Sequence, residues 1–65
     1  DLDFFETIVR NSFQFKRKTI RNNLKKYDLS IVEEVLIKHG FNLNTRAEDL
    51  GVEVFVDLTN ALYKE

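Results

Sequence analysis

Residues 52–63, VEVFVDLTNALY, decide the fold class, because two patterns compete within them. Three valines alternate along the first half of the stretch: Val52, Val54 and Val56. Alternating β-branched residues favour a β-strand. Helical spacing returns in the second half, through Leu58, Ala61, Leu62 and Tyr63. No partner strand is evident elsewhere in the chain, so we predict a helix across the whole stretch.

The apolar face of this helix is wide. At about 100° per residue it covers more than roughly 200° of the circumference. The polar side consists of Glu53, Asp57, Asn60 and Lys64. A face of that width predicts that the helix is buried on more than one side.

A core helix is also predicted near the N-terminus, where Asp3 and Glu6 have the spacing of a capping box. Ser12 falls inside its apolar face, where a small side chain lets another helix approach closely. The apolar residues of this face occupy about half of the circumference; they are Phe4, Phe5, Ile8, Val9, Phe13 and Phe15.

The segment 18–27 is the second predicted helix. Ile20, Leu24 and Tyr27 form a narrow apolar stripe along it. The opposite side is polar and basic, with Lys18, Arg21, Asn22, Lys25 and Lys26.

A third helix is predicted to open with the capping box of Ser30 and Glu33. Gly40 is expected to end it in a left-handed conformation, so that Phe41 packs back on Leu36. Its apolar face consists of Ile31, Val32, Val35 and Leu36. After a helical turn at 47–50 the last helix follows. The fold prediction is therefore an all-α bundle of about four helices without a sheet.

The length and composition exclude several classes of protein. With 65 residues, 43% of them hydrophobic, the chain can form one globular domain. The absence of cysteine excludes disulfides and thiolate metal sites, and it suits the cytoplasm. No apolar run is long enough for a membrane span. Because the sequence begins with Asp1 instead of methionine, we expect it to be a fragment of a longer chain.

Residues suited to catalysis are missing. The single histidine, His39, lies near a predicted helix C-terminus on the apolar side, which favours a packing or dipole role. The acidic residues lack metal-ligand spacing. Gly40 and Gly51 stand alone, so no glycine-rich loop can hold a phosphate or dinucleotide. The sequence thus predicts no catalytic, cofactor or metal site in this chain.

The charge is divided unevenly. Residues 10–26 carry seven basic side chains and no acidic one, whereas the rest of the chain has three basic and eleven acidic residues. Such a segment can simply keep a surface solvated. Here, however, no acid is available for pairing within the segment, and its like charges repel each other. A phosphate backbone would remove that repulsion and release counterions, so we predict contact with a nucleic acid.

The sequence of residues 16–24, KRKTIRNNL, resembles the start of the C-terminal domain of small-subunit rRNA adenine dimethyltransferases. Before it, Phe4, Phe5, Val9, Arg10 and Phe13 match the same domain. Further matches follow in order: Gly40, Phe41, Arg46, Ala47, Glu48, Leu50, Leu58, Asn60, Ala61 and Leu62. Three positions depart from the pattern. Phe15 stands where the family commonly has Gln, Lys16 where it has Arg, and Gly51 where it has Ser.

The resemblance implies a small helical domain that follows a Rossmann-like S-adenosylmethionine domain. Enzymes of this family transfer two methyl groups to each of two adjacent adenosines near the end of small-subunit rRNA. Their cofactor loop and catalytic motif belong to the first domain and match no residue here. Residues 1–65 are therefore expected to be inactive alone and to hold no cofactor. The expected partners are small-subunit rRNA, the small ribosomal subunit and the missing N-terminal methyltransferase domain.

Under this interpretation Lys16, Arg17 and Lys18 are the leading phosphate contacts, supported by Arg21, Lys25 and Lys26. Arg46 is a further candidate for RNA contact, unless it pairs with Glu48 or Asp49. Thr19, Asn22 and Asn23 are candidates to cap or pin the turn between the first two helices. The alternative function is a free-standing helical module that binds DNA or a protein.

Overall fold

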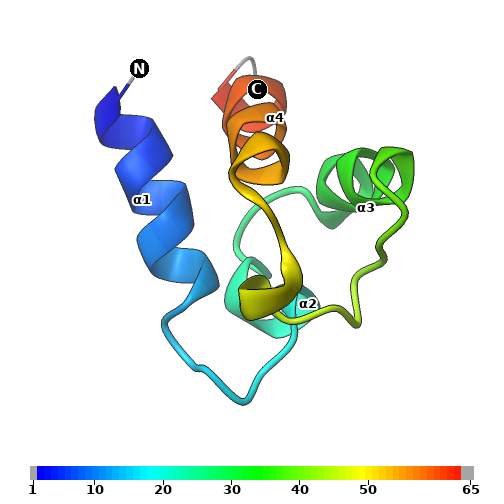
Figure 1. Ribbon diagram of the computed structural model, residues 1–65. Helices are drawn as coiled ribbons and strands as arrows, with labels where there is room; N and C mark the ends of the chain where they lie inside the picture. The colour runs from blue at the N-terminus through cyan, green and yellow to red at the C-terminus, as the bar shows by residue number, and fades with distance from the viewer. Residues whose placement is uncertain (1, 64–65) are drawn as a thin grey trace.

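The structure is a computed structural model that describes residues 2–63, and within them it contains helices and no strand (Figure 1). The elements in chain order are α1 (Leu2–Ser12), α2 (Ile20–Asn23), α3 (Leu29–Lys38), the 3₁₀-helix η1 (Ala47–Asp49) and α4 (Val52–Tyr63). This confirms the prediction of a small all-α bundle. It also confirms a helix across the ambiguous valine-rich stretch.

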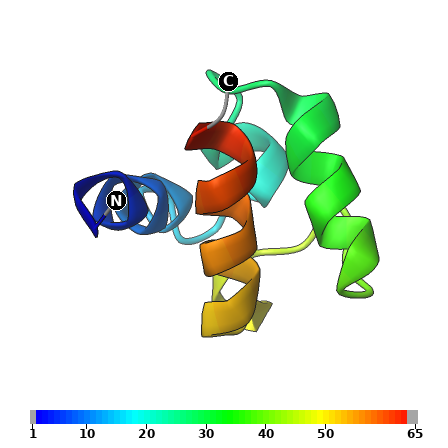
Figure 2. The same ribbon diagram turned by 90° about the horizontal axis from the view of Figure 1, so that it is seen from above.

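The helix α4 lies between α1 on one side and α3 on the other, and it runs antiparallel to α3 (Figure 2). Packing on two sides explains why its apolar face is so wide, as predicted. Part of this apolar face is not buried: Val52 is 71% exposed and Val56 is 41% exposed. Lys64, which the sequence assigned to the polar side, lies outside the described residues.

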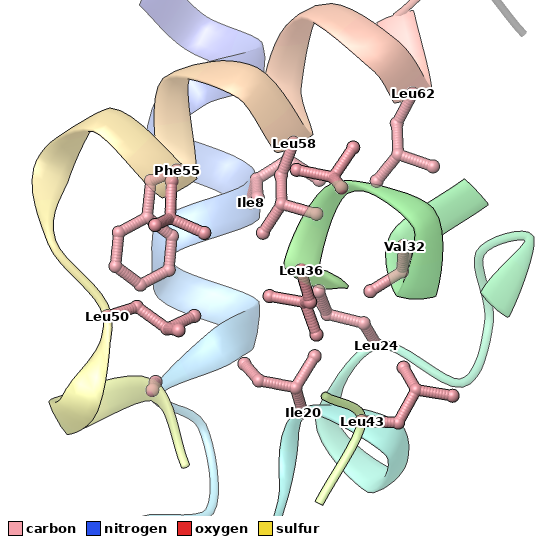
Figure 3. Packing of buried hydrophobic residues seen from close by; sticks show 13 residues of the cluster. Ile8, Ile20, Leu24, Val32, Leu36, Leu43, Leu50, Phe55, Leu58 and Leu62 are labelled. Carbon is pink, nitrogen blue, oxygen red and sulfur yellow. The ribbon is translucent and has the colours of Figure 1, made fainter. Parts of the chain in front are cut away.

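The core forms where all four α-helices meet (Figure 3). Six apolar side chains have an exposed fraction of 0%: Ile8, Ile20, Leu24, Val32, Leu36 and Leu58. Ser12 is buried as well, and its hydroxyl donates to the carbonyl oxygen of Ile8 at 2.7 Å. The predicted core faces of the helices are thus largely the observed ones.

Both capping boxes were wrong in position. The N-cap of α3 is Asp28, two residues before Ser30, and its carboxylate accepts from the Ser30 N–H at 3.0 Å. The Ser30 hydroxyl and N–H both donate to this carboxylate and lower the pKa of Asp28 below its ordinary value of 3.8. In α1, Asp3 lies inside the first turn and is not its cap. An acidic residue in a first turn is still favourable, because it faces the positive end of the helix dipole.

The predicted second helix was too long. Of the segment 18–27 only Ile20–Asn23 is helical, and Lys18 precedes α2 while Lys25 and Lys26 follow it. Consecutive asparagines are poor helix formers because their side chains compete for backbone hydrogen bonds. The apolar stripe nevertheless holds, since Ile20 and Leu24 are buried and Tyr27 is half-buried.

The end of α1 also differs from the prediction. The helix stops at Ser12, so Phe13 and Phe15 fall in the following loop and are 40% and 53% exposed. They had been assigned to the core face. Phe13 keeps a partner in α4, with its ring centroid 6.0 Å from that of Phe55.

The predicted glycine stop of α3 is confirmed. Gly40 has a φ of 83°, a left-handed conformation that glycine adopts without a steric penalty. Its N–H donates to the carbonyl of Ile37 at 3.0 Å, and the Phe41 N–H donates to that of Leu36 at 2.8 Å. These two bonds make a Schellman motif. Phe41 also packs against the core, which directs the chain toward η1.

Gly51 and Gly40 should respond in opposite ways to the same substitution. Gly51 precedes α4, has no left-handed φ and lacks a capping side chain. A Cβ there would come within 2.5 Å of the Glu53 carboxylate, which can swing away. We expect Gly51→Ser to raise the free energy of unfolding by about 0.5–1 kcal/mol, through an N-cap bond and a less flexible unfolded chain. Gly40→Ser should lower it by about 1–2 kcal/mol. Urea unfolding of both variants measures this, and a loss of stability for Gly51→Ser would contradict it.

Candidate nucleic-acid interface

The leading cationic residues lie at the tip of a hydrogen-bonded turn. The N–H of Lys18 donates to the carbonyl oxygen of Phe15 at 2.9 Å, so Lys16 and Arg17 occupy the two central positions of the turn. All three cationic side chains are exposed. The turn thus presents three adjacent positive charges to solvent on a backbone that is locally fixed.

The side chain of Asn23 holds this turn against the domain. Its Nδ2 donates to the carbonyl oxygens of Ser12 at 2.8 Å and Phe15 at 3.1 Å, and the residue is only 8% exposed. The prediction that Asn23 pins the junction is confirmed. Thr19 does occupy the N-cap position of α2, but its side chain makes no capping bond.

A second turn carries two more lysines at the other end of α2. The Tyr27 N–H donates to the carbonyl of Leu24 at 3.0 Å, which places Lys25 and Lys26 at the centre of this turn. The Lys26 ammonium lies 5.4 Å from the centroid of the Tyr27 ring, a cation–π distance. Tyr27 is itself held to α1, because its hydroxyl accepts from Asn11 Nδ2 at 2.9 Å. Exposed Arg21 lies on α2 between the two turns.

Arg46 is brought to the same end of the molecule by long-range hydrogen bonds. The N–H groups of Ile20 and Arg21 donate to the carbonyls of Thr45 at 2.9 Å and Leu43 at 3.0 Å. These bonds satisfy helix-start donors that would otherwise lack partners, and they lay the loop before η1 along α2. Figure 1 shows this loop and the α1–α2 loop beside α2, away from both marked termini.

The cations at this end form no ion pair among the described residues. Within residues 2–63 no carboxylate oxygen lies within 4.0 Å of a charged nitrogen of the predicted RNA-contact residues, which are Lys16, Arg17, Lys18, Arg21, Lys25, Lys26 and Arg46. The proposed pairing of Arg46 with Glu48 or Asp49 is therefore not observed. Among the described residues, His39 Nε2 and Asp57 Oδ2 share a hydrogen bond of 2.6 Å between the end of α3 and α4. His39 thus has a structural partner, as its place at a helix end suggested.

The sequence analysis did not predict a pocket that lies between the two turns. It is lined by Gln14, Phe15, Asn22, Asn23, Lys25 and Lys26, and we call it the Phe15 pocket. The prediction had placed Phe15 in the core and Asn22 on a long helix. The sequence did offer a signal for an exposed ring, because Phe15 directly precedes three cationic residues. Its helical spacing from Ile8 led us instead to assign it to the core face.

None of the helices within residues 2–63 has the length and apolar content that crossing a membrane requires. In the same residues, no three side chains of the His, Cys, Asp or Glu type are grouped so as to hold a metal ion.

Comparison with known proteins points to one family. The chain is 48% identical over 59 residues to a protein of Chlorobium phaeobacteroides named ribosomal RNA small subunit methyltransferase A, with 89% of the chain covered. Proteins of the same name from Francisella tularensis and Ureaplasma urealyticum are 46% and 35% identical, covering 92% and 98% of the chain. No family model and no solved structure matches.

The match involves only a part of these relatives. The chain covers 20%, 22% and 23% of the three proteins, while nearly all of its own residues are aligned. The resemblance that the sequence showed between Phe4 and Leu62 is thus confirmed over nearly the whole chain. The chain belongs to the family of small-subunit ribosomal RNA methyltransferases A, and it spans between a fifth and a quarter of the length of the curated relatives it matches.

Proposed function

We propose that residues 1–65 form the helical rRNA-binding domain of a cytoplasmic enzyme that dimethylates two adjacent adenosines of small-subunit rRNA. The observation that carries this proposal is the cluster of exposed cations around α2, none of which has a carboxylate partner within residues 2–63. The names of the relatives support rRNA as the substrate class of the whole enzyme.

In this proposal the cationic residues bind phosphates and do not read bases. Lys16, Arg17 and Lys18 make the first contact, because their turn projects from the domain. Arg21, Lys25 and Lys26 extend the contact along α2, and Arg46 adds a charge from the neighbouring loop. Exposed cations at turns suit backbone contact, which positions a protein on RNA without selecting a sequence.

S-adenosylmethionine chemistry belongs to another part of the enzyme. The sequence offers no glycine-rich loop, so we assign no residue of this chain to the cofactor. The methyltransferase domain is proposed to dock on the exposed apolar surface between α1 and α4, where Leu2, Phe5 and Val56 line a shallow pocket. Leu2 is 82% and Val56 41% exposed, and contiguous exposed apolar side chains of this kind are typical of a surface that another protein surface covers.

The alternative of a DNA-reading module has less support. A recognition helix must lie along the major groove and present several side chains to base edges. The helix of the basic segment, Ile20–Asn23, has only four residues, and Asn23 is already used in holding the loop. Phosphate contact needs no such helix.

The proposal is tested by titrating purified small ribosomal subunits with the chain, with large subunits as the control. We expect saturable, salt-sensitive binding that is tighter for small subunits. Labelled S-adenosylmethionine added to the same complexes should transfer no methyl group, because the catalytic domain is missing. Equal binding to both subunits would contradict the docking role, and methylation free of host enzyme would contradict the assignment of the chemistry to another domain.

A further inference from the structure

The Phe15 pocket combines an exposed ring with cationic and amide side chains. Phe15 is 53% exposed, and no other ring within residues 2–63 pairs with it. Phe13, two residues earlier, differs in this respect because its ring lies against Phe55. An exposed phenylalanine that lies outside the core cluster and has no ring partner contributes little to the stability of the fold.

The backbone of Phe15 is nevertheless fixed. Its carbonyl oxygen accepts two hydrogen bonds, from the Lys18 N–H at 2.9 Å and from Asn23 Nδ2 at 3.1 Å. The ring is therefore carried on a held turn and not on a free loop. A preorganised aromatic surface loses little conformational entropy when it binds a flat ligand.

The rest of the pocket supplies the other groups that a nucleotide requires. Lys25 and Lys26 line one part of it, and neither ammonium group has a carboxylate oxygen within 4.0 Å among the described residues. The Asn22 amide, which has both donors and an acceptor, makes no hydrogen bond within residues 2–63 and is partly exposed. Aromatic stacking, a phosphate-binding cation and a free amide are the elements by which proteins hold unpaired RNA bases.

We propose that the Phe15 pocket holds an unpaired base of RNA, with the base stacked on Phe15. The adjoining phosphate contacts Lys25 or Lys26, and Asn22 bonds the base edge. This inference rests on the proposed RNA-binding function and adds to it a preference for single-stranded RNA. A base within a duplex is stacked on its neighbours and cannot reach the ring.

The test uses the absence of tryptophan from the chain. Phe15→Trp introduces a single fluorophore into the pocket, and Phe13→Trp is the matched control two residues away. An unstructured single-stranded RNA should quench the fluorescence of Phe15→Trp strongly. A duplex RNA of equal length should quench it weakly, and Phe13→Trp should show no such difference.

Affinity measurements complete the test. Phe15→Ala should weaken binding of the single-stranded RNA by at least about fivefold, the lower range of a base–aromatic stack, and leave duplex binding unchanged. Phe13→Ala should change the binding of neither the single-stranded nor the duplex RNA. Circular dichroism serves as the folding control. Equal binding of both RNAs by the parent chain, unaltered by Phe15→Ala, would overturn this inference alone. Failure of the parent chain to bind any RNA at low salt would overturn the proposed function as well.

Discussion

Replacing Lys16, Arg17 and Lys18 together with alanine is expected to remove much of the salt dependence of RNA binding. Each lost phosphate contact should lower the slope of log affinity against log salt by up to about one unit. Between about 50 and 200 mM salt, the affinity of the parent chain should fall more than that of the variant. For three lost contacts the two decreases should differ by roughly 20- to 40-fold. The fold should survive, because all three side chains are exposed and lie outside the helices. RNA binding across a salt series measures the effect.

Two controls separate phosphate contact from general charge. The variant Lys16→Arg, Arg17→Lys, Lys18→Arg keeps every charge and should retain the slope of the parent chain. Lys38→Ala removes an exposed charge from the end of α3, outside the basic segment, and should change the slope little. If the triple alanine variant is folded and keeps the affinity and slope of the parent chain, the turn serves only to solvate the surface.

Substituting Asn23 is expected to have the second large effect, on stability. Asn23→Ala deletes both hydrogen bonds that hold the α1–α2 loop and leaves the Ser12 and Phe15 carbonyls without this donor. We expect a loss of about 1–3 kcal/mol in the free energy of unfolding. Asn23→Asp should cost more, because it turns a buried acceptor toward two carbonyl oxygens. Urea unfolding of the three proteins gives the order of stability.

The neighbouring asparagine is the matched control. Asn22→Ala lies on the same short helix, and the Asn22 side chain makes no hydrogen bond within residues 2–63. Its stability should stay within about 0.5 kcal/mol of the parent chain. If Asn23→Asp proved as stable as the parent chain, the loop would not depend on the amide, and the turn that carries Lys16 and Arg17 would need another explanation.

Several features could be predicted from the sequence alone. The left-handed stop at Gly40 follows from the conformational freedom of glycine, and the helix at 52–63 follows from apolar spacing. The charge of residues 10–26 and the resemblance of the chain to a known family were also readable directly. The stop at Gly40 is the clearest case, because its physical cause lies in the glycine itself.

The surroundings of α2, in contrast, depend on tertiary structure. Its first N–H groups bond to Leu43 and Thr45, and the Asn23 side chain bonds to the loop after α1. These partners are 8 to 25 residues apart in the sequence, and helical periodicity carries no information about them. The same long-range bonds bring Arg46 beside the basic segment and leave Phe15 exposed on a fixed turn. Identifying the cationic residues therefore required only the sequence, but the two turns and the pocket between them depend on hydrogen bonds that only the folded chain can form.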